Sequence, residues 1–134
     1  IYDDYAHHPT EIIASVQGLR ELYPAGEKNI IVLFQPHLYS RTKALFDDFT
    51  KCFNGADQVL LLPIYFARED KDESISSEKL AEAIAKTGEK AQAFVSFEEA
   101  EIVIKSLNLG PNDIFITMGA GEAYKVADKV FNIA

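Results

Sequence analysis

Residues 29–42 decide the fold, and they read Asn29-Ile30-Ile31-Val32-Leu33-Phe34-Gln35-Pro36-His37-Leu38-Tyr39-Ser40-Arg41-Thr42. The first six residues provide a continuous apolar run, which is typical of a strand buried on both faces of a parallel sheet. Beyond the polar segment, apolar residues recur at helical spacing from 45 to 53, with Ser40 as the expected N-cap of that helix. The stretch predicts a strand, a loop carrying His37 and Arg41, and a helix.

Strand-like and helix-like segments alternate on both sides of this stretch. We expect further strands near residues 58–62, 91–95 and 113–118, and helices over 10–23, 77–87, 97–107 and 122–131. Such alternation predicts the α/β class, as a Rossmann-like three-layer α/β/α domain with a mostly parallel sheet of five to six strands. No linker, repeat or low-complexity tract interrupts the sequence, so we expect residues 1–134 to form a single domain.

A second polar stretch covers residues 3–11, which read Asp3-Asp4-Tyr5-Ala6-His7-His8-Pro9-Thr10-Glu11. Pro9 suits the first position of a helix, and the residue before a proline is kept out of the helical region. We therefore expect a loop over residues 3–8 that leads into a helix N-terminus. The unpaired amides of that terminus and the imidazoles beside them indicate an anion site. The alternative is a capped loop whose histidines are merely solvated.

The predicted topology places the polar loops together. Parallel strands with right-handed crossovers present their carboxyl ends at one edge of the sheet, where ligands bind in open α/β folds. We expect four loops at that edge: 3–8, 35–42, 63–72 and 119–121. Tyr124 occupies the third glycine position of a dinucleotide fingerprint, so we interpret residues 119–121 as a tight strand-to-helix turn. The sequence contains no lysine-bearing phosphate loop, and a nucleotide triphosphate would need another domain.

Composition narrows the class of partner. The formal net charge is −8, the pI is about 4.8 and the lysines do not cluster, which disfavours a nucleic-acid surface. Cys52 is the single cysteine and lies in an apolar helical pattern, so we expect it to be buried. No apolar run has the length of a membrane span and no signal peptide is visible, so the expected location is cytoplasmic, without a membrane partner.

Together, the two polar stretches resemble the two signatures of the Mur ligase C-terminal domain, and most closely those of the members that use L-alanine. Residues 64–69, 75–78 and 118–121 follow in the order of that family, so the resemblance covers nearly the whole chain. It implies the third domain of an ATP-dependent ligase, which joins L-alanine to UDP-N-acetylmuramate through an acyl phosphate in peptidoglycan precursor synthesis. The missing N-terminal and central domains would bind the UDP-sugar, ATP and Mg²⁺, and the isolated domain is expected to be inactive.

The resemblance also implies roles for five residues. Asp4 would face the nucleotide, and His7 would donate to phosphate or acyl-phosphate oxygens. Tyr5 would line the amino-acid pocket. His37 and Arg41 would bind the carboxylate of alanine, because the planar guanidinium suits two carboxylate oxygens at once. His7 and His37 are the expected catalytic residues.

Leu38 departs from the family pattern, because some relatives carry a second arginine at that position. The carboxylate would then depend mainly on Arg41. The charge-rich segment 68–73 is interpreted as a solvated loop, and Arg68 is left out of the expected site.

Three alternatives stay open at this stage. A murein tripeptide ligase of the same family, which attaches L-Ala-D-Glu-diaminopimelate, has phenylalanine at the position of Tyr5. A response-regulator receiver needs an aspartate after its middle strand, where Gln35 stands here, and is therefore disfavoured. A metal site from Asp4, His7 and His37 is chemically conceivable, but His8 diverges from His7 and no i, i+4 histidine pair exists; we expect no metal ligand.

Overall fold

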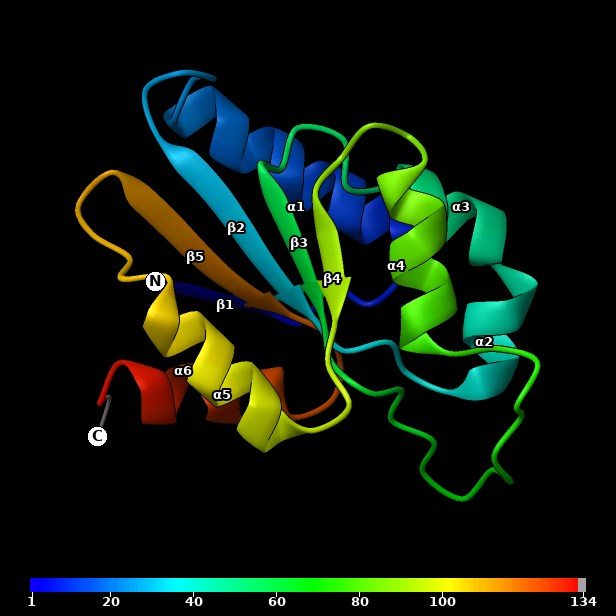
Figure 1. The fold of residues 1–134 in the computed structure, drawn as a ribbon. Coiled ribbons are helices and arrows are strands. Elements are labelled where there is room, and N and C mark those ends of the chain that lie inside the picture. Colours follow the sequence, from blue (N-terminus) through cyan, green and yellow to red (C-terminus); the bar gives the residue numbers. More distant parts are fainter. Residues whose placement is uncertain (133–134) are drawn as a thin grey trace.

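The computed structural model describes residues 1–132 and contains a five-stranded, entirely parallel sheet covered by helices on both faces (Figure 1). The strand order is β1-β5-β2-β3-β4. The strands are β1 (Tyr2–Asp4), β2 (Asn29–Phe34), β3 (Gln58–Leu61), β4 (Ala91–Ala93) and β5 (Asp113–Met118). This architecture confirms the predicted α/β class and the parallel sheet.

Two helical layers enclose the sheet. The helices are α1 (Pro9–Leu22), α2 (Tyr39–Ala44), α3 (Phe46–Lys51), α4 (Ser77–Ala85), α5 (Phe97–Ser106) and α6 (Ala123–Val130). Figure 1 shows α5 and α6 on one face and α1, α3 and α4 on the other. Each layer encloses its own apolar core: Ile12 and Phe53 belong to the core under α1, α3 and α4, and Phe94 and Val126 to the core under α5 and α6.

The central strand β2 explains why an apolar run specifies this fold. Its residues alternate between the two cores, with Val32 and Phe34 facing α1 and α3, and Ile31 and Leu33 facing α5 and α6. All four side chains are buried, because parallel strands in the middle of such a sheet have no face toward water. The bounds of β2 agree with the expected strand.

The amino-terminal segment differs from the expected loop. Residues 2–4 form β1, which pairs with β5 through Tyr2 and Ile116 at one end and Asp4 and Met118 at the other. The prediction of a loop over 3–8 was therefore wrong for its first two residues. A three-residue edge strand is too short to show an apolar alternation. Its hydrogen-bond partner also lies more than a hundred residues away in the sequence, so nothing local predicts it.

The start of α1 confirms the reading of Pro9 as the first helical residue. His8 is the N-cap, and its Nδ1 accepts a hydrogen bond from the backbone N–H of Thr10 at 3.2 Å. The Glu11 carboxylate accepts the backbone N–H groups of His7 and His8 at 3.2 and 3.1 Å. This capping box satisfies amides at the helix start that would otherwise have no partner.

The segment after β2 departs from the expected single helix. It forms two short helices, α2 and α3, that are separated at Leu45. Leu38, not Ser40, occupies the N-cap position, with a positive φ of 70°. The expectation for Ser40 was wrong: Ser40 lies inside α2, and its hydroxyl donates to the Glu69 carboxylate instead of capping the helix.

Cys52 is fully buried in the core between the sheet and α1, α3 and α4, as expected. Burial raises the pKa of its thiol, because the charged thiolate loses its hydration. Among residues 1–132, no helix is both long and apolar enough to span a membrane.

Candidate functional site

Four rings from three loops form a row at the carboxyl edge of the sheet. We call Tyr5, His7, His37 and Tyr65 the aromatic row. Centroid distances along it are 5.2 Å from Tyr5 to His7, 6.5 Å from His7 to His37 and 5.1 Å from His37 to Tyr65. The loops after β1, β2 and β3 therefore converge as the parallel topology predicts, and they bring His7 and His37 together.

The side chain of Gln35 forms hydrogen bonds to two neighbouring loops at this edge of the sheet. Its side chain is buried; Nε2 donates to the carbonyl of Pro63 at 3.2 Å and Oε1 accepts the backbone N–H of Glu122 at 2.8 Å. The loops after β2, β3 and β5 are thus connected by one side chain. Sequence reasoning missed this role, although a polar residue directly after a fully apolar strand is the kind of signal that would have indicated it.

The loops after β2 and β3 also pair through their backbones. The N–H of Tyr65 donates to the carbonyl of Pro36 at 2.9 Å, and the N–H of Leu38 donates to the carbonyl of Tyr65 at 2.6 Å. This isolated parallel bridge places the ring of His37 against that of Tyr65, at an interplanar angle of 22°. The bridge includes Leu38, which is the N-cap of α2, and α2 carries Arg41.

The surroundings of His37 favour its neutral form. Burial lowers the pKa of its imidazole, and the nearby charges of Arg41 and His7 lower it further, while Glu69 opposes them. The ion pairs found among residues 1–132 do not include Arg41. The guanidinium is therefore a half-exposed cation beside the aromatic row, with no carboxylate of this part of the chain pairing with it.

The carboxylates of Asp3 and Asp4 accept hydrogen bonds from neighbouring parts of the domain. Asp4 Oδ1 accepts the backbone N–H of Ala6 at 2.9 Å, and Asp4 Oδ2 accepts the hydroxyl of Ser15 in α1. Asp3 Oδ1 accepts the hydroxyl of Thr117 in β5 at 2.6 Å. The structure thus gives both carboxylates partners inside the domain, and Asp4 orients the loop that carries Tyr5 and His7.

Comparison with known proteins identifies the family of this chain. The family model described as "Mur ligase, glutamate ligase domain" matches residues 1–121. This chain belongs to the Mur ligase family. The Mur ligase domain is 46% identical over 128 residues to the UDP-N-acetylmuramate–L-alanine ligase of Clostridium acetobutylicum. That match covers 96% of this chain and 27% of the relative, so the chain spans less than a third of it.

Solved structures agree with the fold of this Mur ligase domain. The UDP-N-acetylmuramate-alanine ligase of Thermotoga maritima superimposes with a TM-score of 0.72 at 25% identity, over 96% of this chain and 25% of that one. A separate domain from Haemophilus ducreyi, described as part of a UDP-N-acetylmuramate:L-alanyl-gamma-D-glutamyl-diaminopimelate ligase, gives 0.67 at 22% identity, over 97% and 86%. The second comparison supports the fold alone.

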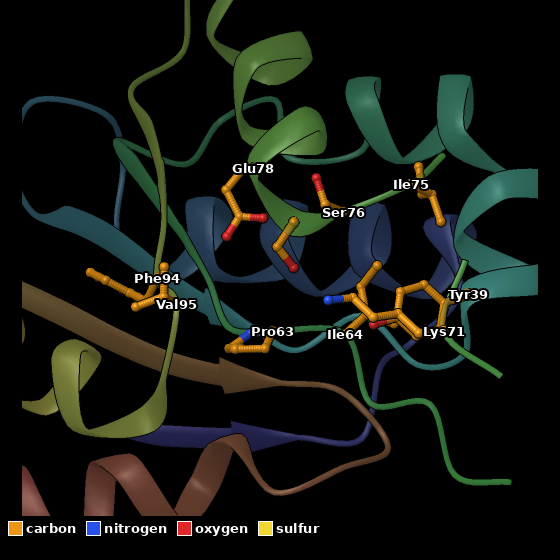
Figure 2. Close-up of a pocket in the computed structure, with 10 residues that line it drawn as sticks. Tyr39, Pro63, Ile64, Lys71, Ile75, Ser76, Glu78, Phe94 and Val95 are labelled. Carbon is orange, nitrogen blue, oxygen red and sulfur yellow. The ribbon is translucent and has the colours of Figure 1, made fainter. Parts of the chain in front are cut away.

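Two cavities lie near the carboxyl edge of this Mur ligase domain. One of about 200 Å³ adjoins the aromatic row and is lined by Asp3, Tyr5, Tyr124 and the glycine turn. The other, about 270 Å³, lies toward β4. Figure 2 shows Tyr39 and Lys71 on one side of it and Phe94 on the other. Only the first includes an expected site residue, Tyr5.

Within residues 1–132 of this Mur ligase domain, no group of three or more His, Cys, Asp or Glu side chains is arranged to hold a metal ion. Asp4 is engaged by Ala6 and Ser15, so it does not join His7 and His37 in a ligand set. Arg68 is exposed in the loop after β3, as expected for a solvated segment.

Proposed function

We propose that this chain is the C-terminal domain of a three-domain ligase that joins L-alanine to UDP-N-acetylmuramate, using ATP. The observation that carries the proposal is the convergence of His7, His37 and Arg41 at one sheet edge, in a chain similar to ligases named for that reaction. The clustering supports a site for an anionic substrate. Because the substrates are nucleotide-linked and water-soluble, we also propose a cytoplasmic location.

Arg41 and His37 are proposed to bind the carboxylate of the amino acid. The guanidinium of Arg41 is a cation beside the aromatic row, and its planar pair of donors suits a planar carboxylate. Neutral His37 adds a hydrogen bond without another desolvated charge. This arrangement would hold the amine of L-alanine in one orientation toward the activated carboxyl group, which lowers the entropic part of the barrier.

His7 is proposed to donate to phosphate or acyl-phosphate oxygens, and Tyr5 to cover the amino acid. Tyr5 is 69% exposed in this chain, which suits a ring that becomes covered when another domain closes over it. Closure would exclude water and strengthen the interactions of His7 and Arg41 with anionic oxygens. Asp4 is proposed to act near the nucleotide mainly by orienting this loop, since both of its oxygens already accept hydrogen bonds.

ATP and Mg²⁺ are proposed to be held mainly by the central domain. The part of the chain that the structure describes offers no metal cluster, and the sequence has no lysine-bearing phosphate loop, so its donor set does not fit a complete triphosphate site. ATP would supply the phosphoryl group that activates the lactyl carboxylate. Binding and orienting the amino acid is the contribution proposed for the residues of this domain.

A domain exchange tests the proposal. This chain would replace the matching C-terminal region of the Clostridium acetobutylicum ligase, and phosphate release would be followed with UDP-N-acetylmuramate and ATP. We expect turnover that depends on L-alanine, and none from the 134-residue chain alone. A folded chimera that is inactive with L-alanine contradicts the proposal. ATP-dependent turnover by this chain alone contradicts the three-domain part of it.

The second candidate is a ligase for the tripeptide L-Ala-D-Glu-diaminopimelate. Structural similarity to the Haemophilus ducreyi domain is the reason to consider this candidate, but at 22% identity that similarity extends to the fold only. The same chimera decides between the candidates when both acceptors are supplied in parallel. A higher kcat/KM for the tripeptide than for L-alanine would replace the first candidate with the second.

A further inference from the structure

Nδ1 of His37 is a buried polar atom without a hydrogen-bond partner among the described residues. Buried polar groups in folded proteins are nearly always paired, so an unpaired one calls for a physical explanation. The ring itself is only half-buried, and Nε2 is not among the buried atoms that lack a partner. The two nitrogens of His37 therefore lie in different environments.

The unpaired position indicates which nitrogen carries the proton. A neutral imidazole has one N–H donor and one bare nitrogen acceptor, and which is which follows from the surroundings. Burying an N–H without an acceptor loses a strong hydrogen bond, whereas a bare nitrogen loses a weaker interaction with water. The lower-energy arrangement leaves Nδ1 bare and places the proton on Nε2.

Tyr65 creates this environment. Its ring stacks on His37 at 5.1 Å, and its backbone pairs on both sides of His37 through Pro36 and Leu38. The backbone bridge fixes the path of the chain through His37, and the ring covers one face of the imidazole. Tyr65 is 39% exposed, so burial in an apolar core does not explain its position, whereas stacking on His37 does.

The charged groups around His37 act in the same direction. Arg41 from α2 and His7 from the loop after β1 disfavour a second ring proton, and Glu69 from the loop after β3 favours one. Burial together with Arg41 and His7 outweighs Glu69, so the pKa of His37 lies below that of an ordinary histidine. Near pH 7 the ring is neutral and carries one proton.

We propose that Tyr65 is a positioning residue that fixes His37 with its ring proton on Nε2, so that this nitrogen donates a hydrogen bond to an anionic oxygen of the bound substrate. The identity of that oxygen, a carboxylate oxygen of the amino acid, rests on the proposed function. The tautomer and the role of Tyr65 do not. His37 is then a donor in the reaction and not a general base.

The test is nitrogen NMR of the histidine ring nitrogens in the 134-residue chain, since two-bond and three-bond correlations distinguish a protonated from a bare nitrogen. We expect bare Nδ1 and protonated Nε2 for His37 near pH 7. In Tyr65→Leu we expect the Nδ1-protonated tautomer to appear and the pH of half-protonation to rise. Tyr65→Phe retains the ring and should match the wild type. Phe66→Ala, which removes a neighbouring ring that contacts Tyr39 instead, is the control.

Nδ1 protonation in the wild type would overturn the proposal, and so would a Tyr65→Leu spectrum identical to the wild type. Backbone amide spectra establish that each variant is folded. In the active chimera, Tyr65→Leu should raise KM for L-alanine about tenfold, equivalent to about 1.4 kcal/mol, with kcat nearly unchanged. If the chimera does not use L-alanine, the proposed function fails while the NMR result still decides the tautomer.

Discussion

The side-chain amide of Gln35 occupies the space that a Cβ atom on Gly121 would fill. A Cβ atom on Gly119 would lie 2.8 Å from the carbonyl oxygen of Gln35, and Gly119 has a positive φ of 130°. The turn after β5 therefore packs against Gln35 at two points where no side chain fits. This close approach lets Gln35 reach the N–H of Glu122 and hold the turn against the end of β2.

Gly121→Ala should destabilise the domain by about 1–3 kcal/mol, because the added methyl group displaces the Gln35 amide from its hydrogen bonds. Urea denaturation followed by circular dichroism gives the free energy of unfolding. Gly18→Ala is the matched control: Gly18 lies within α1 with open space around it and should gain about 0.5–1 kcal/mol. A Gly121→Ala domain as stable as the wild type would disprove the close packing.

In the chimera with the Clostridium acetobutylicum ligase, Arg41→Ala should lower kcat/KM for L-alanine by about ten- to a hundredfold, which is about 1.5–3 kcal/mol of transition-state stabilisation. Stability should change little, because none of the ion pairs found in residues 1–132 includes Arg41. Lys43→Ala, in the same helix but paired with Asp72, is the control and should retain activity. An unchanged kcat/KM in Arg41→Ala would remove the carboxylate assignment.

Glu11 should make the start of α1 sensitive to acid. Hydrogen bonds from the backbone N–H groups of His7 and His8 lower the pKa of its carboxyl group. A lowered pKa means that the stabilisation is fully present above the unfolded-state value, near 4.5, and is lost as pH falls through the folded-state value. The difference in unfolding free energy between the wild type and Glu11→Gln should therefore be largest at neutral pH and vanish in acid. Equal differences at both extremes would contradict this.

Cys52 should react with thiol reagents only when the domain unfolds. Its side chain is completely buried, and burial raises its pKa, so the reactive thiolate is scarce in the folded state. Labelling rates measured across a urea series should follow the unfolded fraction. Ser106→Cys at this exposed position, in a Cys52→Ala background, provides the comparison and should react at once. Fast labelling of Cys52 in native buffer would show that the core opens locally.

Sequence reasoning was most accurate where one physical effect dominates. The predicted bounds of β2 and β5 agree with the structure, because largely apolar runs in the middle of a sheet reflect burial and little else. The one-edge arrangement of the loops followed from the handedness of parallel connections. The strand β1 was missed because its pairing with β5 depends on residues far away in the sequence.

The residues of the candidate site were proposed from the sequence, whereas their contacts could not be predicted from it. His7, His37 and Arg41 were proposed because they lie beside strand ends and match the family resemblance. The positive φ of Leu38 and the break at Leu45 were not predicted. Leu38 pairs with the backbone of Tyr65 and Ser40 with the carboxylate of Glu69, and neither contact can be read from the local sequence. The roles of Gln35 and Tyr65 likewise depend on neighbours in space, which periodicity does not reveal.

The anchoring of three loops by Gln35 has a thermodynamic consequence for binding. A loop that is ordered only when its ligand arrives gives up conformational entropy at that moment, and the affinity is weaker by that amount. Here the buried amide orders the loops during folding, before any substrate is present. A substitution of Gln35 that leaves the core intact would thus weaken substrate affinity without removing a single group that touches the substrate.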